Sequence, residues 1–335
     1  MRPTFFLAAT AASLGLAVPA AKEERAASQF KFFGINESGP EFGETNLPGT
    51  LGTDYVWPNL TTVGTFVQQG MNTFRVNFLM ERLTENSMNA TLNAAYLSDL
   101  KNTVNNITAQ GAYAMIVPHN YGRFYSNIIT DVSGFQTWWQ QLAKQFASND
   151  KVIFDINNEF HDMEQSLVVQ LNQAGINGIR AAGAASQYIT VEGNAYTGAW
   201  TWVSSGNAAT MGNLTDPKGL LIYQMHQYLD SDSSGTSATC VSSTIGAERL
   251  QAATQWLKTN SKKGIIGEYA GGNNDVCKTA VKGMLNHMTE NSDVWMGAIW
   301  WAAGPWWGDS YIFNLEPKDG ICFNSYMTEL KQFSA

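Results

Sequence analysis

The sequence predicts an α/β protein, a single-domain (β/α)8 TIM barrel, and three observations favour this fold. Eight short runs of apolar and β-branched residues recur along the chain, each followed by a polar or amphipathic stretch. The runs are continuously apolar instead of alternating, which is typical of parallel strands that are covered on both faces. A chain of 335 residues also has the length that eight strand-and-helix repeats require.

The expected strands are the eight apolar runs, at residues 30–37, 72–78, 112–119, 152–159, 188–192, 221–228, 264–269 and 294–301. Helices are expected between them, among others at residues 94–109, 135–146, 163–182 and 246–259. The alternative, a doubly wound open sheet, usually has a glycine-rich phosphate loop after an early strand, and neither GxGxxG nor a P-loop occurs here. No linker rich in Pro, Ser or Thr interrupts the chain, so we expect one barrel domain at residues 30–335.

The N-terminus resembles an export signal. Arg2 precedes an apolar stretch from Phe5 to Val18, and a small residue, Ala20, follows. This stretch is shorter than the roughly 20 apolar residues that span a bilayer. We therefore expect a signal peptide at residues 1–20, a pro-segment or N-terminal tail at residues 21–29, and a secreted, extracellular protein.

Composition excludes several classes of partner. The chain has 20 Lys and Arg against 28 Asp and Glu, a net charge of −8, and no basic block. Nucleic acids and anionic membrane surfaces need clustered positive charge, so neither is expected as a partner. The 11 Trp, 12 Tyr and 17 Phe can bury much apolar surface, which argues against disorder.

Each expected strand ends in polar or aromatic residues: Asn36-Glu37, Arg75-Val76-Asn77, His119-Asn120, Asn158-Glu159, Glu192, His226-Gln227-Tyr228, Glu268-Tyr269 and Trp300-Trp301. In a parallel barrel all the carboxyl ends of the strands open onto one face, where active sites are built. This repeated pattern predicts an active site on that face.

Two carboxylates, Glu159 and Glu268, directly follow the fourth and seventh apolar runs. These strands face each other across a barrel mouth, so the two carboxyl groups could approach to about 5 Å, the separation used for double displacement at a sugar carbon. The alternative is that each is an ordinary strand-end residue paired with Arg or Lys. Ionised carboxylates beside such apolar runs are costly unless they are solvated, paired or functional.

Cations and hydrogen-bond donors are expected around these carboxylates. Arg75 is the charged residue of the second run, and His119, His226 and Tyr228 would line the same mouth. Metal binding by the histidines and the glutamates is the rival interpretation. It is disfavoured because the sequence contains neither HExxH nor a Cys/His cluster at ligand spacing, so no metal is expected.

Six blocks of sequence together resemble glycoside hydrolase family 5, and in particular fungal secreted endo-β-1,4-glucanases, the cellulases. The blocks are Phe74-Arg75-Val76, Pro118–Arg123, Asp155-Ile156-Asn157-Asn158-Glu159, Met225–Asp232, Gly267-Glu268-Tyr269-Ala270-Gly271-Gly272 and Ile299–Asp309. The resemblance covers nearly all of residues 30–335. Phe160 departs from the family pattern, which often has proline there.

The resemblance implies that Glu159 is the general acid/base and Glu268 the nucleophile. It also implies that Asn158 binds the sugar 2-hydroxyl, that Arg75 and Tyr228 contact Glu268, and that His226 lies beside Glu159. His119 would border the sugar on the nonreducing side of the cleaved bond, and Trp301 would stack beneath that sugar. No cofactor is implied. With one carboxyl ionised and the other protonated, the rate should be bell-shaped in pH and highest in mild acid.

Exposed aromatic rings are expected to bind a polysaccharide. Trp200, Trp202, Trp306 and Trp307 follow the fifth and eighth strands, on the expected substrate face, although each could equally be packing between barrel and helices. The function predicted is a secreted, monomeric, retaining endo-β-1,4-glucanase that acts on cellulose or β-glucan. The alternatives are a β-1,4-mannanase or xyloglucanase on the same machinery, a non-catalytic glycan-binding barrel, and a metal hydrolase.

Secretion also bears on cysteines and glycosylation. Of three cysteines, Cys240 and Cys277 follow the sixth and seventh strands, so their loops would emerge as neighbours on one face, and the family resemblance implies the same disulfide. Cys322 is expected to be a buried free thiol, and an intermolecular disulfide is the alternative. Five sequons fit a glycoprotein, at Asn36, Asn59, Asn89, Asn106 and Asn213. Asn36 lies in an apolar run, so we expect it to be buried and unmodified.

Overall fold

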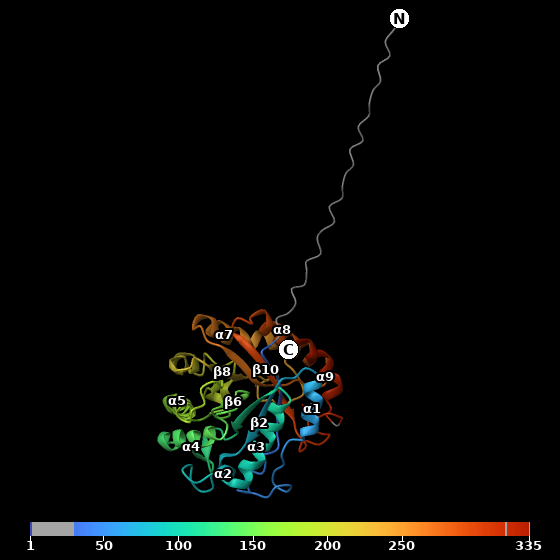
Figure 1. Ribbon diagram of the computed structural model, residues 1–335. Helices are drawn as coiled ribbons and strands as arrows, with labels where there is room; N and C mark the ends of the chain where they lie inside the picture. Colours follow the sequence, from blue (N-terminus) through green and yellow to red (C-terminus); the bar gives the residue numbers. More distant parts are fainter. Residues whose placement is uncertain (2–29, 319, 335) are drawn as a thin grey trace.

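The structure is a computed structural model that describes residue 1, residues 30–318 and residues 320–334. Eight parallel strands form a closed barrel in the order β1-β10-β9-β8-β7-β6-β3-β2, surrounded by helices (Figure 1). The strands are β1 (Phe32–Glu37), β2 (Thr73–Phe78), β3 (Tyr113–Pro118), β6 (Val152–Asp155), β7 (Ile189–Glu192), β8 (Leu221–His226), β9 (Gly264–Tyr269) and β10 (Trp295–Ala303). The fold is therefore the predicted (β/α)8 barrel.

The helices cover the outside of the barrel and include neighbouring pairs such as α4 with α5 and α7 with α8. Their bounds are α1 (Leu60–Gln68), α2 (Met80–Leu83), α3 (Ala94–Ala109), α4 (Val132–Lys144), α5 (Gln165–Ala181), α6 (Asn207–Thr210), α7 (Ile245–Thr259), α8 (Asp275–Glu290) and α9 (Phe323–Leu330). Short 3-10 turns η1 (Ala195–Thr197), η2 (Met211–Asn213) and η3 (Lys331–Phe333), and a small hairpin of β4 (Arg123–Phe124) and β5 (Asn127–Ile128), lie in connections.

Side-chain caps fix where several helices begin. The Asn93 side chain accepts hydrogen bonds from the amides of Ala95 and Tyr96 at the start of α3. Asn274 does the same for Cys277 in α8, and Asp131 for Gly134 in α4. These bonds satisfy amides that have no partner inside the helix.

Apolar residues and polar residues occupy different levels of the barrel interior. A compact apolar cluster, made of Phe32, Met115, Ile153, Ile222, Ile265 and Ile299, comes from six different strands. Two to four residues farther along the same strands, at the same period of two, come polar side chains such as Asn36, Asp155 and Gln224. Polar groups are thereby concentrated toward the carboxyl ends of the strands, where the site lies.

Glycine is required where strands approach closely. A Cβ atom on Gly34 of β1 would lie 1.6 Å from the carbonyl oxygen of Thr73 in β2. A Cβ atom on Gly267 of β9 would lie 2.4 Å from Cδ of Gln224. Gly267, which directly precedes Glu268, therefore leaves room for the Gln224 side chain.

All eight predicted strands occur, with small differences at their ends. The largest is at β6, which ends at Asp155, so that residues 156–159 form a loop instead of strand. By contrast β10 runs two residues past its predicted end, to Ala303. The predicted signal peptide at residues 1–20 and pro-segment at residues 21–29 lie outside the described residues, apart from Met1.

The predicted disulfide is present between Cys240 and Cys277, whose Cα atoms are 5.3 Å apart. It joins the loop after β8 to the first turn of α8. Cys322 is a buried free thiol, as predicted, and Asn36 is fully buried. Within the described ranges, no helix has the length and apolar character needed to cross a bilayer.

Candidate active site

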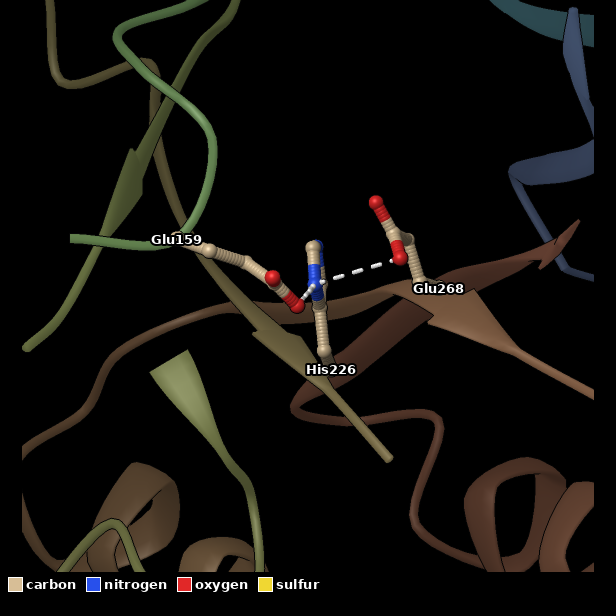
Figure 2. Close-up of side chains that lie close together, drawn as sticks. All are labelled: Glu159, His226 and Glu268. Carbon is tan, nitrogen blue, oxygen red and sulfur yellow. Dashed lines mark hydrogen bonds and ion pairs between the residues drawn. The ribbon is translucent and has the colours of Figure 1, made fainter. Parts of the chain in front are cut away.

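The predicted carboxylates meet at the mouth of the barrel. Glu268 belongs to β9, and Glu159 lies in the loop after β6. One oxygen of each carboxylate lies within 4.8 Å of the other, and His226 of β8 lies between the two side chains (Figure 2). Residues separated by more than one hundred positions in the chain are thus brought together by the closure of the barrel.

Glu268 is held by donors on both oxygens. Arg75 Nη1 donates to Oε1 at 2.8 Å, and the Tyr228 hydroxyl donates to Oε2 at 2.7 Å. His119 Nε2 lies 3.7 Å from Oε1. Burial alone would raise the pKa of Glu268, but His226, His119 and Arg75 together lower it to about 2. Glu268 is therefore an ionised carboxylate near neutral pH.

Glu159 has a different environment. His226 Nδ1 forms a hydrogen bond of 2.6 Å with Glu159 Oε1, and the Glu159 side chain is more exposed than that of Glu268. Burial by itself lowers the pKa of His226, but the charges of Glu268, Glu192 and Glu159 outweigh it and raise the value to about 9. His226 is therefore a cation near neutral pH, and its Nδ1–H group donates the hydrogen bond to Glu159.

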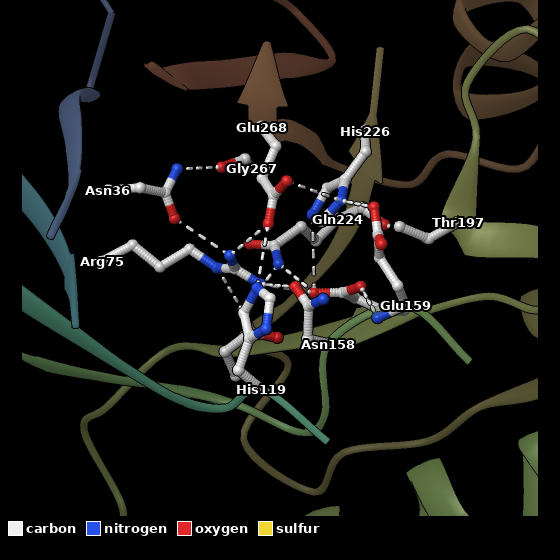
Figure 3. Close-up of polar contacts among 12 residues, drawn as sticks. Asn36, Arg75, His119, Asn158, Glu159, Thr197, Gln224, His226, Gly267 and Glu268 are labelled. Atoms are coloured by element: carbon white, nitrogen blue, oxygen red, sulfur yellow. Dashed lines mark hydrogen bonds and ion pairs between the residues drawn. The ribbon is translucent and has the colours of Figure 1, made fainter. Parts of the chain in front are cut away.

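A buried polar network under the mouth holds the guanidinium of Arg75 in place (Figure 3). Its Nε donates to Asp155 at 2.8 Å, and its Nη2 donates to Asn158 at 2.7 Å and to Glu192 at 3.0 Å. Gln224 Nε2 donates to both Asp155 and Glu192. Every one of these side chains is fully buried, so the orientation of Arg75 toward Glu268 is tightly constrained.

Two cavities flank the carboxylates. The larger, of about 820 Å³, is lined by Glu159 and His226 and by the aromatic residues Tyr196 and Trp200. The smaller, of about 370 Å³, is lined by His119, Trp301 and Trp307. The His119 and Trp301 rings are stacked, with centroids 5.4 Å apart. Tyr121 lines both cavities, so the two cavities adjoin at this residue.

The four tryptophans predicted to face a ligand divide into two groups. Trp200 is 48% exposed and Trp306 is 41% exposed, and Trp307 lines the smaller cavity. The prediction was wrong for Trp202, which is fully buried and packs edge-on against Trp256 and Tyr223. Trp202 faces the helix layer and not the mouth.

The structure brings the other predicted residues together at the mouth: Arg75, His119, Asn158, Glu159, His226, Tyr228, Glu268 and Trp301, with Trp200 on the wall of the larger cavity. Sequence reasoning gave no role to Asp155 or to Glu192. The available signal was their position, since each is an acidic residue at the end of an apolar strand, as Glu268 is.

Glu159, His226 and Glu268 are also close enough to suit a metal ion, each offering one atom within 4.8 Å of the others. The positive charges of Arg75 and His226 disfavour metal binding. The Arg75 guanidinium already neutralises Glu268 at 2.8 Å, and a protonated His226 has no free lone pair on Nδ1. The donor set therefore favours proton transfer over metal binding.

Comparisons with known proteins show the family of the chain. Residues 35–304 match the model of the family described as cellulase, glycosyl hydrolase family 5. The chain is 57% identical to "Probable endo-beta-1,4-glucanase B" of Aspergillus oryzae and 58% identical to "Endo-beta-1,4-glucanase B" of Aspergillus niger, with 98% of both chains covered in each case. Among solved structures it is similar to XacCel5A in complex with cellopentaose, with a TM-score of 0.87, 38% identity, and 91% of this chain and 99% of that chain covered.

Proposed function

Because the chain belongs to glycosyl hydrolase family 5, we propose that it is an endo-β-1,4-glucanase that hydrolyses internal β-1,4-glucosidic bonds of cellulose and β-glucan by double displacement. The observation that supports this most strongly is the separation of the two carboxylates, within 4.8 Å. Retaining enzymes have carboxyl groups about 5 to 5.5 Å apart, whereas inverting enzymes leave a wider gap for water. A retaining reaction fits this distance.

In the first step Glu268 attacks the anomeric carbon while Glu159 protonates the oxygen of the leaving sugar. The bond from the anomeric carbon to that oxygen breaks, and an ester to Glu268 forms. Arg75 and Tyr228 fix both oxygens of Glu268, and the charges of His226, His119 and Arg75 keep it ionised. The His226 hydrogen bond orients the Glu159 carboxyl toward the same place.

In the second step Glu159, now a carboxylate, takes a proton from water as the water attacks the anomeric carbon. The ester bond breaks, Glu268 leaves as a carboxylate, and the sugar is released with its configuration retained. Asn158 supports both steps, because Arg75 fixes its amide oxygen and leaves Nδ2 without a partner among the described residues. We assign that donor to the sugar 2-hydroxyl.

The flanking cavities support attack within a chain. Sugar units can occupy both sides of the carboxylates, against Tyr196 and Trp200 on one side and Trp301 and Trp307 on the other. Flat sugar faces stack on such rings while hydroxyls bind polar groups. The cellopentaose bound by XacCel5A is an extended ligand of this kind.

We further propose that the protein is secreted as a monomer. The N-terminal sequence pattern and the Cys240–Cys277 disulfide support export into an oxidising compartment. The remaining sequons, at Asn59, Asn89, Asn106 and Asn213, are then candidates for glycosylation, whereas Asn36 is fully buried.

The test is hydrolysis of defined oligosaccharides and polymers. We expect cello-oligosaccharides and carboxymethyl-cellulose to be cut internally, with β-configured reducing ends formed first, and manno-oligosaccharides to be poor substrates. Faster cleavage of mannan would assign the chain to the mannanase specificity instead. Activity should survive EDTA, and its complete loss on chelation would support the metal hydrolase.

A further inference from the structure

Glu192, the last residue of β7, is a further carboxylate at the mouth and is fully buried, and the two-step reaction proposed above does not use it. Both of its oxygens are engaged. Oε2 accepts the backbone N–H of Glu159 at 2.7 Å. Oε1 accepts from Arg75 Nη2 at 3.0 Å and from Gln224 Nε2, and lies 3.7 Å from His226 Nε2.

The hydrogen bond between Glu192 and the Glu159 amide lies at a residue with an unusual backbone conformation. Glu159 has φ of +47°, in the left-handed region that a residue with a side chain enters at a cost of about 1 kcal/mol or more. This conformation follows from the early end of β6, after which the chain turns into the mouth. Without Glu192, the amide of Glu159 would lose its hydrogen-bond acceptor.

Glu192 also acts on the histidine that contacts Glu159. His226 donates from Nδ1 to Glu159, while its Nε2 faces Glu192 and has no hydrogen-bond partner in the described part of the chain. The ionised form of Glu192 favours the imidazolium form of His226 at this distance. Glu192 therefore touches both the backbone and the side-chain partner of Glu159.

The groups around Glu192 shift its pKa in opposite directions. Burial and the nearby Asp155 raise its pKa to about 8, whereas His226, Arg75 and the Glu159 amide lower it. The facing groups come from four elements: Arg75 on β2, Asp155 on β6, Gln224 and His226 on β8, and Glu159 in the loop after β6.

From these contacts we infer that Glu192 is a positioning residue for Glu159: it fixes the Glu159 backbone and keeps His226 directed at the Glu159 carboxyl, so that proton donation to the leaving oxygen depends on it. The inference rests on the proposed function, because it assigns to Glu192 a share of the acid step. It distinguishes Glu192 from Asp155, which shares Arg75 and Gln224 as partners but, within the described residues, forms no hydrogen bond or ion pair with Glu159 or His226.

Asp155 therefore provides a matched control. Replacing Asp155 also removes a buried carboxylate from this network. Its loss should change the position of Arg75 and, through Arg75, that of the nucleophile Glu268, but not the position of Glu159. Proton donation matters most when the leaving group is a poor one, and least when the leaving group departs as a stable anion. Two substrates, phenyl β-cellobioside and 2,4-dinitrophenyl β-cellobioside, separate these effects.

The experiment measures kcat/KM for wild type, Glu192→Gln, Asp155→Asn and Glu159→Ala on both substrates. We expect Glu192→Gln to lose at least about 10-fold more activity on the phenyl substrate than on the dinitrophenyl substrate. Asp155→Asn should lose the same factor on both. Equal losses on the two substrates for Glu192→Gln would overturn the inference, because a merely structural role does not distinguish leaving groups.

The Glu159→Ala variant separates this inference from the proposed function. If Glu159→Ala shows the leaving-group selectivity and Glu192→Gln does not, the proposed function stands and the role of Glu192 is rejected. If Glu159→Ala shows no selectivity, the assignment of Glu159 as the acid is wrong, and the inference is rejected with it.

Two further measurements apply if Glu192→Gln does not fold. Glu192→Asp keeps the carboxyl group but withdraws it by one methylene, and it should show the same selectivity to a smaller degree. In the wild-type protein, the amide hydrogen of Glu159 should exchange slowly with solvent although it lies outside a strand. Rapid exchange of that amide would contradict the hydrogen bond on which the inference depends.

Discussion

Glu37, at the end of β1, shows what a single buried carboxyl does to stability. It is fully buried, and neither of its carboxyl oxygens has a hydrogen-bond partner among the described residues. Burial, and then the charge of Glu316, raise its pKa well above 4.5. The folded state therefore binds this proton more tightly than the unfolded state, and stability should fall as pH rises above 4.5.

Glu37→Gln should remove that penalty, because the amide is neutral at every pH. We expect the variant to gain at least about 1.4 kcal/mol of unfolding free energy relative to wild type on going from pH 4 to pH 7, the equivalent of one pKa unit. Denaturant unfolding at the two pH values measures it. The same difference between variant and wild type at both values would contradict the assignment.

At this scale the sequence predicted which residues meet, but not their backbone conformations. Arg75, His226 and Glu268 could be placed at the mouth because strand ends in a parallel barrel share one face. The left-handed φ of Glu159 and its bond to Glu192 depend on where β6 ends, and apolar patterning locates an element's end only to within a few residues. The role of Glu192 was missed for that reason.

Among the connections, the segment between β7 and α6 contains the two tryptophans that sequence reasoning could not tell apart. Trp200 and Trp202 are two residues apart in an irregular segment, so no helical or strand period assigns them to different faces. In the structure the Trp200 ring is half-exposed, with the Arg249 guanidinium 4.4 Å from its centre. Trp202 packs into the helix layer.

Substitution should separate these two roles. Trp200→Ala should leave the melting temperature nearly unchanged but lower kcat/KM by about 10-fold on oligosaccharides long enough to reach the larger cavity, because a stacking surface worth about 1 to 1.5 kcal/mol is lost. Trp202→Ala should cost about 3 to 5 kcal/mol of stability. Thermal unfolding and a chain-length series measure both, and a destabilised Trp200→Ala would contradict the distinction.

The strands and long helices were predicted well because their signals are local. Continuous apolar runs identify buried parallel strands, and α3 begins and ends at the predicted residues. The small hairpin of β4 and β5 was not predicted, since its strands of two residues each are too short to form a pattern. The closure of the sheet into a barrel was predicted from the number of strand-and-helix repeats.

For the whole molecule, the shifted pKa values predict the pH of greatest stability. The lowered pKa of Glu268 contributes stability that is present above 4.5 and lost as pH falls toward 2. The raised pKa of His226 contributes stability that is present below 6.5 and lost as pH rises through about 9, and Glu192 adds a loss between 4.5 and about 8. The folded state therefore loses stability both below and above mildly acidic pH.

We expect the melting temperature to be highest in mildly acidic buffer and to fall on both sides. His226→Gln should flatten the alkaline side between pH 6.5 and 9, since it removes the group whose proton is lost there. Calorimetry across this range measures both curves. A melting temperature that rose steadily from pH 5 to pH 9 in the wild-type protein would contradict these assignments.

The most direct measurement of the central claim is to trap the covalent intermediate. A 2,4-dinitrophenyl 2-deoxy-2-fluoro-β-cellobioside slows both steps but keeps a good leaving group, so the ester accumulates. Mass spectrometry of the digested protein should locate one fluorocellobiosyl group on Glu268, with Glu159 unmodified. A label on Glu159, or release of the leaving group with no label anywhere and an inverted product, would contradict a double displacement between these two carboxylates.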